Sequence, residues 1–215
     1  MESRGGPAVG ILGRIVAAIH RKTPSSNAKK PAPTLRMAIV LTVLAEGFEE
    51  IEAVSPIDLL RRAGVEVTVS SLGTDLEVVG RSGILLTADV TLAEVIQQTF
   101  DCLLLPGGPG VKHLRADPRI VPLVQRHAAA DSWIAAICAA PTVLHDAGLL
   151  AGRRFTAHPS VASELPALLS AERVVQDGRI ITSRGAGTAV DFGLAVVEAL
   201  QGKARAEEVR RAICA

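Results

Sequence analysis

The chain has 215 residues, of which 48% are hydrophobic and only 2% aromatic, and its formal net charge is +1 at pH 7. This length suits one α/β domain with a complete core, or one domain with a tail. The small net charge and the few aromatic rings exclude nucleic acid as the main partner, and no apolar run is long enough to span a membrane. Three cysteines without paired spacing predict neither a disulfide framework nor a zinc site, and they favour a reducing compartment.

Residues 1–36 differ in charge from the rest of the chain. They hold seven Lys/Arg and a single acid, Glu2, whereas residues 37–215 hold 16 Lys/Arg and 21 Asp/Glu. A basic, acid-poor leader with an apolar stripe is typical of a transit peptide for a mitochondrion or plastid. A disordered tail, or a true start at Met37, fits equally well. We therefore predict a leader and linker over 1–36, a domain over 37–215, and a cytoplasmic location unless the leader is a targeting segment.

The first half of the domain follows the order strand, helix, strand and hairpin. Met37–Val43 is an apolar run typical of a buried strand, and Val65–Val69 alternates apolar and polar residues. Between them, Glu49–Ala63 is predicted to be a helix. Glu77–Val79 and Ile84–Thr87 flank a turn with two glycines and predict a hairpin.

The second half continues this alternation and ends in two helices. The expected elements are a helix at Thr91–Gln98, a strand at Asp101–Leu105, a helix at Asp117–Ala130, a strand at Trp133–Ile137, a short helix from Pro141, a strand near Phe155, a hairpin of Arg173–Val175 with Arg179–Thr182, and helices at Thr188–Leu200 and Ala204–Ile213. Such alternation predicts an α/β fold with a doubly wound, mostly parallel sheet and helices on both faces. Ligands bind beyond the carboxyl ends of such strands, so the turns after Val43, Leu105 and Ile137 should meet there.

Cys138 stands where an apolar strand meets a helix that starts at Pro141. Proline is favoured in the first turn of a helix, so the sulfur should lie at a helix N-terminus. The partial positive charge and free N–H groups there favour a thiolate, which makes Cys138 a candidate nucleophile. A buried cysteine at a strand end is the alternative, because free cysteines are among the most buried residues.

Three other features could share this edge of the sheet. Glu52, in the first turn of the first helix, could be a protonated partner of the sulfur, although acids there also stabilise the helix dipole from solvent. His158 follows the strand expected near Phe155 and could act as a base or orienting group, although a lone histidine is more often a surface residue. The glycine turn with Gly107 and Gly108 could turn backbone N–H groups toward an anionic oxygen. No cluster has metal-ligand spacing.

From Met37 to Gln201 the chain resembles the ThiJ/PfpI superfamily, in its Parkinson-disease-protein deglycase branch (the DJ-one proteins). The matching segments are Ala45–Glu52, Leu60–Val65, Leu105–Gly108, Ala135–Ala139, His158–Pro159, Thr182–Gly185 and Gly187–Thr188. The resemblance implies a flavodoxin-like homodimer.

The resemblance also implies a role for individual residues. Cys138 matches the reactive cysteine, Glu52 its protonated partner and His158 the nearby histidine. Gly108 and Ala139 match the residues whose backbone N–H groups form the oxyanion site, and Arg81 matches an arginine near the dimer contact.

Three departures from the family pattern bear on the pocket. Pro109 replaces an asparagine after the glycine pair, and Ala186 replaces a proline before Gly187. The first two could reshape the pocket. The chain also ends soon after its last helix, so a further C-terminal helix is expected to be missing or short, which would leave the site more open.

The resemblance implies a glutathione-independent glyoxalase or a protein deglycase. Its substrates would be methylglyoxal, a small dicarbonyl, or early glycation adducts on proteins, and its chemistry needs no metal or organic cofactor. The alternative is a redox sensor or chaperone that uses the same cysteine. A cysteine peptidase of another branch fits less well, because that branch has a histidine directly after the nucleophile and Ala139 stands there. A glutamine amidotransferase would need a His-x-Glu that is not found.

Overall fold

The computed structural model describes residues 37–215, so the predictions made for residues 1–36 lie outside the described residues. The main sheet has seven strands in the order β5-β2-β1-β6-β7-β9-β8. All neighbours are parallel except β8 and β9, which form an antiparallel pair. The strands are β1 Ile39–Leu44, β2 Glu66–Ser71, β5 Val90–Thr91, β6 Cys102–Leu105, β7 Trp133–Ile137, β8 Val174–Asp177 and β9 Ile180–Ser183. The fold is the doubly wound α/β arrangement that the sequence predicted.

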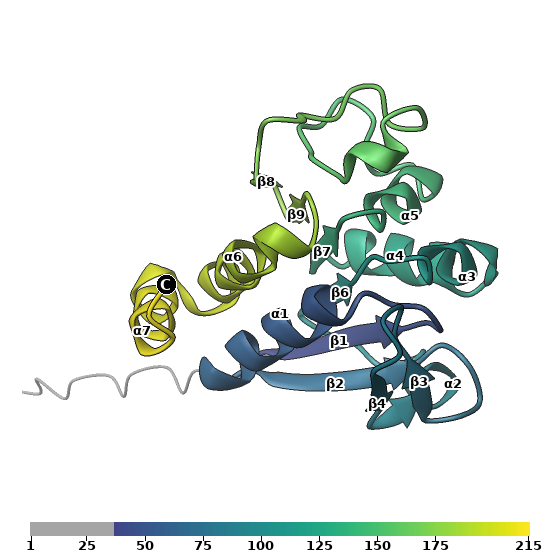
Figure 1. Cartoon of the computed structure of the whole chain (residues 1–215), viewed down its shortest axis with the longest axis horizontal. Helices are drawn as coiled ribbons and strands as arrows, with labels where there is room; N and C mark the ends of the chain where they lie inside the picture. The colour runs from purple at the N-terminus through teal and green to yellow at the C-terminus, as the bar shows by residue number, and fades with distance from the viewer. Residues whose placement is uncertain (1–36) are drawn as a thin grey trace, which may run out of the picture. The chain divides into compact units, whose positions relative to one another are not determined.

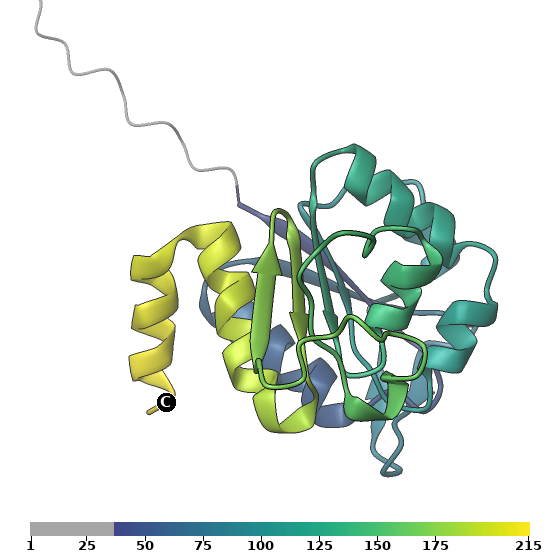
Figure 2. The same cartoon turned by 90° about the horizontal axis from the view of Figure 1, so that it is seen from above.

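Helices cover both faces of the sheet (Figure 1). One apolar core lies between the sheet and α1, α6 and α7, and a second lies between the sheet and α3, α4 and α5. The helices are α1 Glu50–Arg62, α2 Leu92–Val95, α3 Val111–Ala116, α4 Ile120–Ala129, α5 Pro141–Asp146, α6 Ala189–Gln201 and α7 Lys203–Ala212. Figure 2 shows α6 and α7 as neighbouring helices on one side of the sheet. No helix within residues 37–215 is both long and apolar enough to cross a bilayer.

Both predicted hairpins form. The first pairs β3 (Glu77–Val79) with β4 (Leu85–Thr87) in a separate two-stranded sheet. The second is the β8–β9 pair at the edge of the main sheet. The first hairpin contacts the start of α1, because the Arg81 N–H donates to the Phe48 carbonyl and the Ser82 N–H donates to Glu50.

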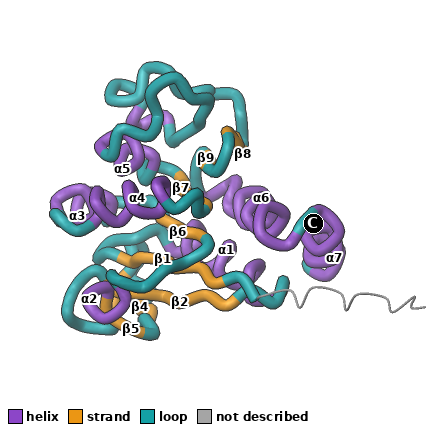
Figure 3. Tube along the Cα trace, turned by 180° about the vertical axis from the view of Figure 1, so that it is seen from behind, coloured by secondary structure: helices purple, strands orange, loops and turns teal. Residues whose placement is uncertain are grey.

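The predicted strand near Phe155 is wrong. This segment belongs to the long connection between α5 and β8, whose regular structure is one 3-10 turn at Pro159–Val161 (Figure 3). Its hydrogen bonds are single contacts with different partners, not a ladder. The Thr156 N–H donates to the Thr182 hydroxyl, and the Leu169 N–H donates to the Phe155 carbonyl. Without a neighbouring strand, an apolar segment remains an irregular but buried connection.

Helix lengths also differ from the sequence predictions. The helix expected at Thr91–Gln98 is the short α2, which Thr91 and Glu94 begin as a capping box. Helix α3 was not predicted, and α4 begins at Ile120 because Asp117 ends α3 and pairs with Arg119. Of these elements, α3 begins directly after the glycine turn that follows β6.

Candidate active site

A tight turn after β7 fixes the position of Cys138. Its φ of +65° is uncommon for a residue with a side chain, and the surrounding hydrogen bonds maintain it. The Cys138 N–H donates to the Ser183 carbonyl at 2.9 Å, and the His158 N–H donates to the Cys138 carbonyl at 2.8 Å. Helix α5 then begins at Pro141, as predicted. The turn therefore presents a half-buried side chain at the edge of the sheet.

Glu52 reaches the same edge from the first turn of α1 and is only 1% exposed. The side chain of Glu49 caps this helix by accepting the Glu52 N–H at 2.8 Å. The Glu52 Oε2 atom in turn accepts the Gly107 N–H at 3.0 Å. The alternative that Glu52 stabilises the helix dipole from solvent is wrong, because its side chain is buried.

The glycine turn after β6 contacts both of these segments. A Cβ atom at Gly107 would lie 2.5 Å from Glu52 Oε2 and 2.6 Å from Cys138 Cβ, so no side chain fits there. Gly108 has a φ of +91°, and a Cβ atom there would lie 2.6 Å from the Glu49 nitrogen. The turns after β1, β6 and β7 therefore meet at one edge of the sheet, as the sequence predicted.

Gly185 marks the point where three candidate side chains converge. A Cβ atom at this position would lie 3.9 Å from the Cys138 sulfur, 3.6 Å from Glu52 Oε1 and 3.3 Å from His158 Cδ2. These side chains come from the end of β7, from α1 and from the long connection after α5. The absence of a side chain at Gly185 leaves space beside all three.

Cys138 and Glu52 influence each other's ionisation. Burial raises the pKa of Glu52 from 4.5 to about 7, against the lowering effect of its hydrogen bond with Cys138, and the Glu49 charge raises it further. Burial, followed by the charge and hydrogen bond of Glu52, raises the pKa of the Cys138 thiol to about 12. The backbone N–H groups of Gly108 and Ala139 lower it.

The thiolate at Cys138 stays a prediction, and an ionised Glu52 opposes it. The N–H groups near the helix start act in the expected direction, but burial and the neighbouring carboxylate outweigh them. Protonation of Glu52 removes its negative charge and leaves the two N–H groups in place. The ionisation of the two groups is therefore coupled, because ionised Glu52 raises the pKa of the thiol and the hydrogen bond with Cys138 lowers the pKa of Glu52.

His158 has a different environment from the one expected of a general base. Its side chain is exposed, and Nδ1 accepts the Ser160 N–H at 3.1 Å and lies 2.8 Å from the Ser160 hydroxyl. Because Nδ1 accepts a backbone N–H, the neutral ring carries its proton on Nε2. His158 is thus arranged to donate a proton or hydrogen bond toward the site.

Three contributors to the site carried no assigned role in the sequence prediction. Ser160 fixes the His158 ring, Gly185 leaves the space between the side chains, and the Ala186 N–H lowers the pKa of Glu52. The last contact depends on the family departure at this position, because a proline would have no N–H to donate. The match of Thr182–Gly185 to the family was the sequence signal closest to these residues.

Arg81 lies in the turn between β3 and β4, is not among the residues that converge at Gly185, and has an exposed side chain. The same turn is joined to α1 through Glu50, which accepts the Ser82 N–H at 2.7 Å. Gly80 is required here, because a Cβ atom would lie 2.4 Å from Glu50 Oε1. Helix α1 therefore links the Arg81 turn to the buried Glu52.

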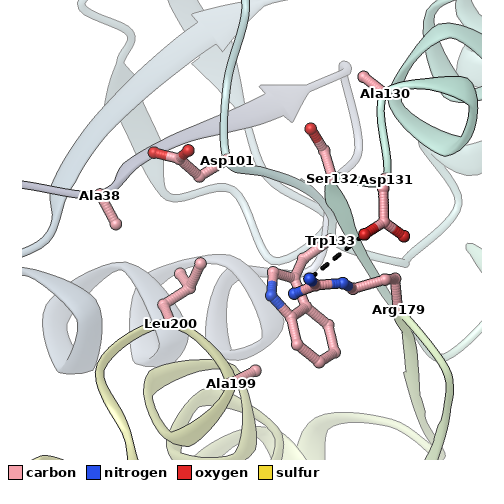
Figure 4. A pocket seen from close by; sticks show the side chains of 9 residues that line it. All are labelled: Ala38, Asp101, Ala130, Asp131, Ser132, Trp133, Arg179, Ala199 and Leu200. Carbon is pink, nitrogen blue, oxygen red and sulfur yellow. Dashed lines mark ion pairs between the residues drawn. The ribbon is translucent and has the colours of Figure 1, made fainter. Parts of the chain in front are cut away.

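A second polar region lies at the opposite, amino end of the strands (Figure 4). Its hollow of about 370 Å³ is bordered by Asp101, Ser132 and Trp133, among others. The Arg179 guanidinium lies 4.8 Å from the centre of the Trp133 ring and 3.3 Å from Asp131. Within residues 37–215, no group of three or more His, Cys, Asp and Glu side chains is arranged to hold a metal ion.

Comparisons with known proteins agree with this arrangement. The protein DJ-1 homolog A of Arabidopsis thaliana is 40% identical over 176 residues, which cover 80% of this chain and 45% of that protein. The chain thus spans less than half of that longer relative. The glutathione-independent glyoxalase DJR-1.2 of Caenorhabditis elegans is 36% identical over 172 residues, covering 79% of this chain and 91% of that protein.

A solved structure has a similar fold. The crystal structure of Drosophila melanogaster DJ-1beta has a TM-score of 0.80 and 37% identity, and the match covers 83% of this chain and 98% of that one. The sequence profile of the DJ-1/PfpI family matches residues 38–199, which include Cys138, Glu52 and His158. With its flavodoxin-like sheet and these relatives, the chain belongs to the DJ-1/PfpI family.

Proposed function

We propose that the protein is a glutathione-independent glyoxalase that converts methylglyoxal into lactate through Cys138. The observation that carries this proposal is the convergence of the Cys138 sulfur, the Glu52 carboxyl group and the His158 ring within 4 Å of one point at Gly185. A relative with the name of this activity, aligned over most of both chains, supports it. Early glycation adducts of methylglyoxal on proteins are a second substrate class for the same chemistry.

The reaction begins when the Cys138 sulfur bonds to the aldehyde carbon C1. The thiol proton moves to Glu52, and the electrons of the C=O bond move to oxygen. The N–H groups of Gly108 and Ala139, which already lower the pKa of the sulfur, are placed to hold this oxyanion. Glu52 then returns the proton to that oxygen, which gives a neutral hemithioacetal.

Glu52 next moves a proton between two carbon atoms. As a carboxylate it takes the proton from C1, and the electron pair forms an enediolate with the C2 oxygen, where His158 Nε2–H can donate a hydrogen bond. Glu52 delivers the proton to C2 while the hydroxyl proton on C1 passes to the C2 oxygen, which gives a lactoyl thioester on Cys138. Water cleaves the C–S bond to release lactate and restore the thiol. A pKa of about 7 suits a group that acts as both acid and base near neutral pH.

The test is lactate formation from methylglyoxal without glutathione. We expect the wild-type chain to form lactate, and Cys138→Ser and Glu52→Gln to lose this activity. Consumption of methylglyoxal by both variants at the wild-type rate would show that another site is responsible. Release of free amine from a methylglyoxal-treated peptide, followed in parallel, tests the glycation adducts.

Oxidant sensing by the same sulfur is a second candidate function. It is favoured by the half-buried position of Cys138 beside an acid that can donate a hydrogen bond to a sulfinate. Titration with hydrogen peroxide and intact-mass measurement would test it. A stable gain of two oxygen atoms at Cys138 is expected, whereas continued oxidation to the sulfonate would argue against a sensor.

We further propose that the protein forms a homodimer through α1 and the β3–β4 hairpin. Ile51 on α1 is 53% exposed and Ile84 in the hairpin is 56% exposed, although both are large apolar side chains. Arg81 lies in the same hairpin. Apolar side chains of this kind favour a protein contact.

Sedimentation of the Ile51→Asp variant tests the dimer. Its mass is expected to halve, while Val190→Asp, at an exposed apolar position on α6, stays dimeric. A wild-type chain that sediments as a monomer at high concentration would contradict this proposal.

A further inference from the structure

A hollow of about 440 Å³ opens beside the site at Gly185. It is bordered by His158 and Pro159 from the long connection, by Arg173 before β8, and by the segment Arg184–Thr188 after β9. Gly185 and His158 are common to this hollow and to the convergence point near the sulfur. A substrate bonded to Cys138 through one end can therefore extend its other end into the hollow.

The side chains around this hollow are positively charged or neutral. Two arginines, Arg173 and Arg184, border it, and no aspartate or glutamate does. Arg173 is already neutralised, because its guanidinium lies 2.6 Å from Asp191 and donates to the Gly187 carbonyl at 3.0 Å. It therefore has little charge left to offer a ligand.

Arg184 differs from Arg173 in this respect. Within residues 37–215 its guanidinium has no ion pair and no hydrogen bond, and its side chain is half-buried. A guanidinium removed partly from water favours an anionic partner, and it binds carboxylate or phosphate oxygens in a bidentate manner.

The position of Arg184 ties it to the nucleophile. The preceding residue, Ser183, accepts the Cys138 N–H, and the following residue, Gly185, approaches the sulfur. Both neighbours of Arg184 along the chain thus contact the nucleophile turn. Arg184 therefore borders the hollow from a segment that adjoins the nucleophile turn.

We propose that Arg184 is a specificity-determining residue that selects substrates with an anionic group. This inference rests on the proposed function at Cys138 and names its substrate class: α-oxoaldehydes that carry a carboxylate or phosphate on the carbon chain. The isomerisation and hydrolysis are those given above and yield the corresponding 2-hydroxy acid.

Alkylation of Cys138 tests this selection without relying on turnover. Iodoacetate and iodoacetamide have nearly the same size and both form an S–C bond with loss of iodide, but only iodoacetate is anionic. Both rates at Cys138 are measured by peptide mass, and the rate with iodoacetate is divided by the rate with iodoacetamide. This ratio is expected to be about tenfold lower in Arg184→Gln than in wild type. Glu52 repels iodoacetate in both proteins, so the change in the ratio isolates Arg184.

Two controls accompany this measurement. Arg154→Gln removes an equal charge from an exposed arginine outside the hollow and should leave the ratio unchanged. Exposed Cys214 reports the intrinsic ratio within the same molecule. An equal ratio at Cys138 in wild type and Arg184→Gln would overturn the proposal.

Steady-state kinetics with anionic substrates provides a second test of the proposal. The value of kcat/KM for 3-phosphooxy-2-oxopropanal and for 2,3-dioxopropanoate should each exceed that for methylglyoxal in wild type, and the larger excess distinguishes phosphate from carboxylate. Arg184→Gln should remove this preference and Arg154→Gln should keep it. If wild type consumes none of the three compounds, the proposed function fails, and the alkylation ratio still decides whether Arg184 binds anions.

Discussion

Strand β9 has an arginine at each end, and the two are used differently. Arg179, before the strand, lies over the Trp133 ring and pairs with Asp131 (Figure 4). Arg184, after the strand, borders the hollow beside Cys138 and has no side-chain partner in the described part of the chain. The first arginine is satisfied by the fold, whereas the second is available to a ligand.

The two ends of the sheet also differ in whether their polar groups are paired within the fold or available to a ligand. At the amino end, polar groups are paired with one another and the hollow contains no free thiol. At the carboxyl end, buried Glu52 and half-buried Cys138 lie beside the space left by Gly185. We therefore expect substitutions at the carboxyl end to change activity and those at the amino end to change stability alone.

The largest effect is expected from the two cysteines of neighbouring strands. Cys138→Ala should lower lactate formation by about a thousandfold or more, because it removes the atom that bonds to the substrate. Cys102→Ala, inside β6 and wholly buried, should keep the activity and lose roughly 1–2 kcal/mol of unfolding free energy. Rates and urea unfolding of both variants check this. Comparable activity losses would remove the functional contrast between strand interior and strand end.

A smaller loss is expected from Gly107→Ala. The added methyl group would meet Glu52 and Cys138 at 2.5 and 2.6 Å, and a displacement near 1 Å lowers the rate by about a hundredfold. The overpacking should also cost about 1–3 kcal/mol of stability. Gly73→Ala is the matched control, since Gly73 is exposed and a Cβ atom there meets nothing within 4 Å. A fully active Gly107→Ala enzyme would show that this packing is not needed for catalysis.

The pH dependence of stability should have opposite signs for two neighbouring acids. The raised pKa of Glu52 favours the protonated form in the folded state, so its contribution is present below pH 4.5 and is lost as the pH rises through 7. Glu52→Gln avoids this loss, and its advantage over wild type should approach about 3 kcal/mol near pH 8.

Glu50→Gln provides the contrasting measurement. Burial raises the pKa of Glu50, but N–H groups of Glu50, Ser82 and Ile84 outweigh it, so the pKa is lowered. Glu50→Gln should therefore be less stable than wild type above pH 4.5, with the deficit vanishing in acid. Melting temperatures of wild type, Glu52→Gln and Glu50→Gln at pH 4, 6 and 8 give the sign of each stability difference. A constant difference between wild type and Glu52→Gln across this range would contradict a proton bound by Glu52.

The smallest effect is expected at the amino end. Arg179→Gln removes a contact with Trp133 that is worth about 0.5–1 kcal/mol, and its ion pair with Asp131 is too exposed to add much. The rate of lactate formation should not change. Chemical unfolding and activity measured on the same preparation check this, and a changed kcat/KM would extend the functional region to the far end of the sheet.

Much of the fold was predictable because its signals are local. The alternation of Val65–Val69 and the glycine turn between Val79 and Ile84 determine a strand and a hairpin without long-range information. The segment at Phe155 was mispredicted because an apolar run becomes a strand only where a neighbouring strand can pair with it. That condition depends on the whole topology.

The candidate site divides in the same way. The types and order of Cys138, Glu52 and His158 could be read from the sequence. The hydrogen bond that sets the proton of the His158 ring could not, because Ser160 is an ordinary residue until its N–H is placed in space. The availability of Arg184 was equally hidden, since it depends on which acids lie near each arginine in the folded chain.

The hydrogen bond from the His158 amide to the Cys138 carbonyl gives the nucleophile turn a natural reporter. A backbone amide exchanges its hydrogen with solvent deuterium only when its hydrogen bond opens. Exchange at His158 therefore times the separation of the long connection from the turn that holds the sulfur. Slow exchange would describe a site assembled before substrate arrives, and faster exchange than in the core strands would describe one that opens and closes as a unit.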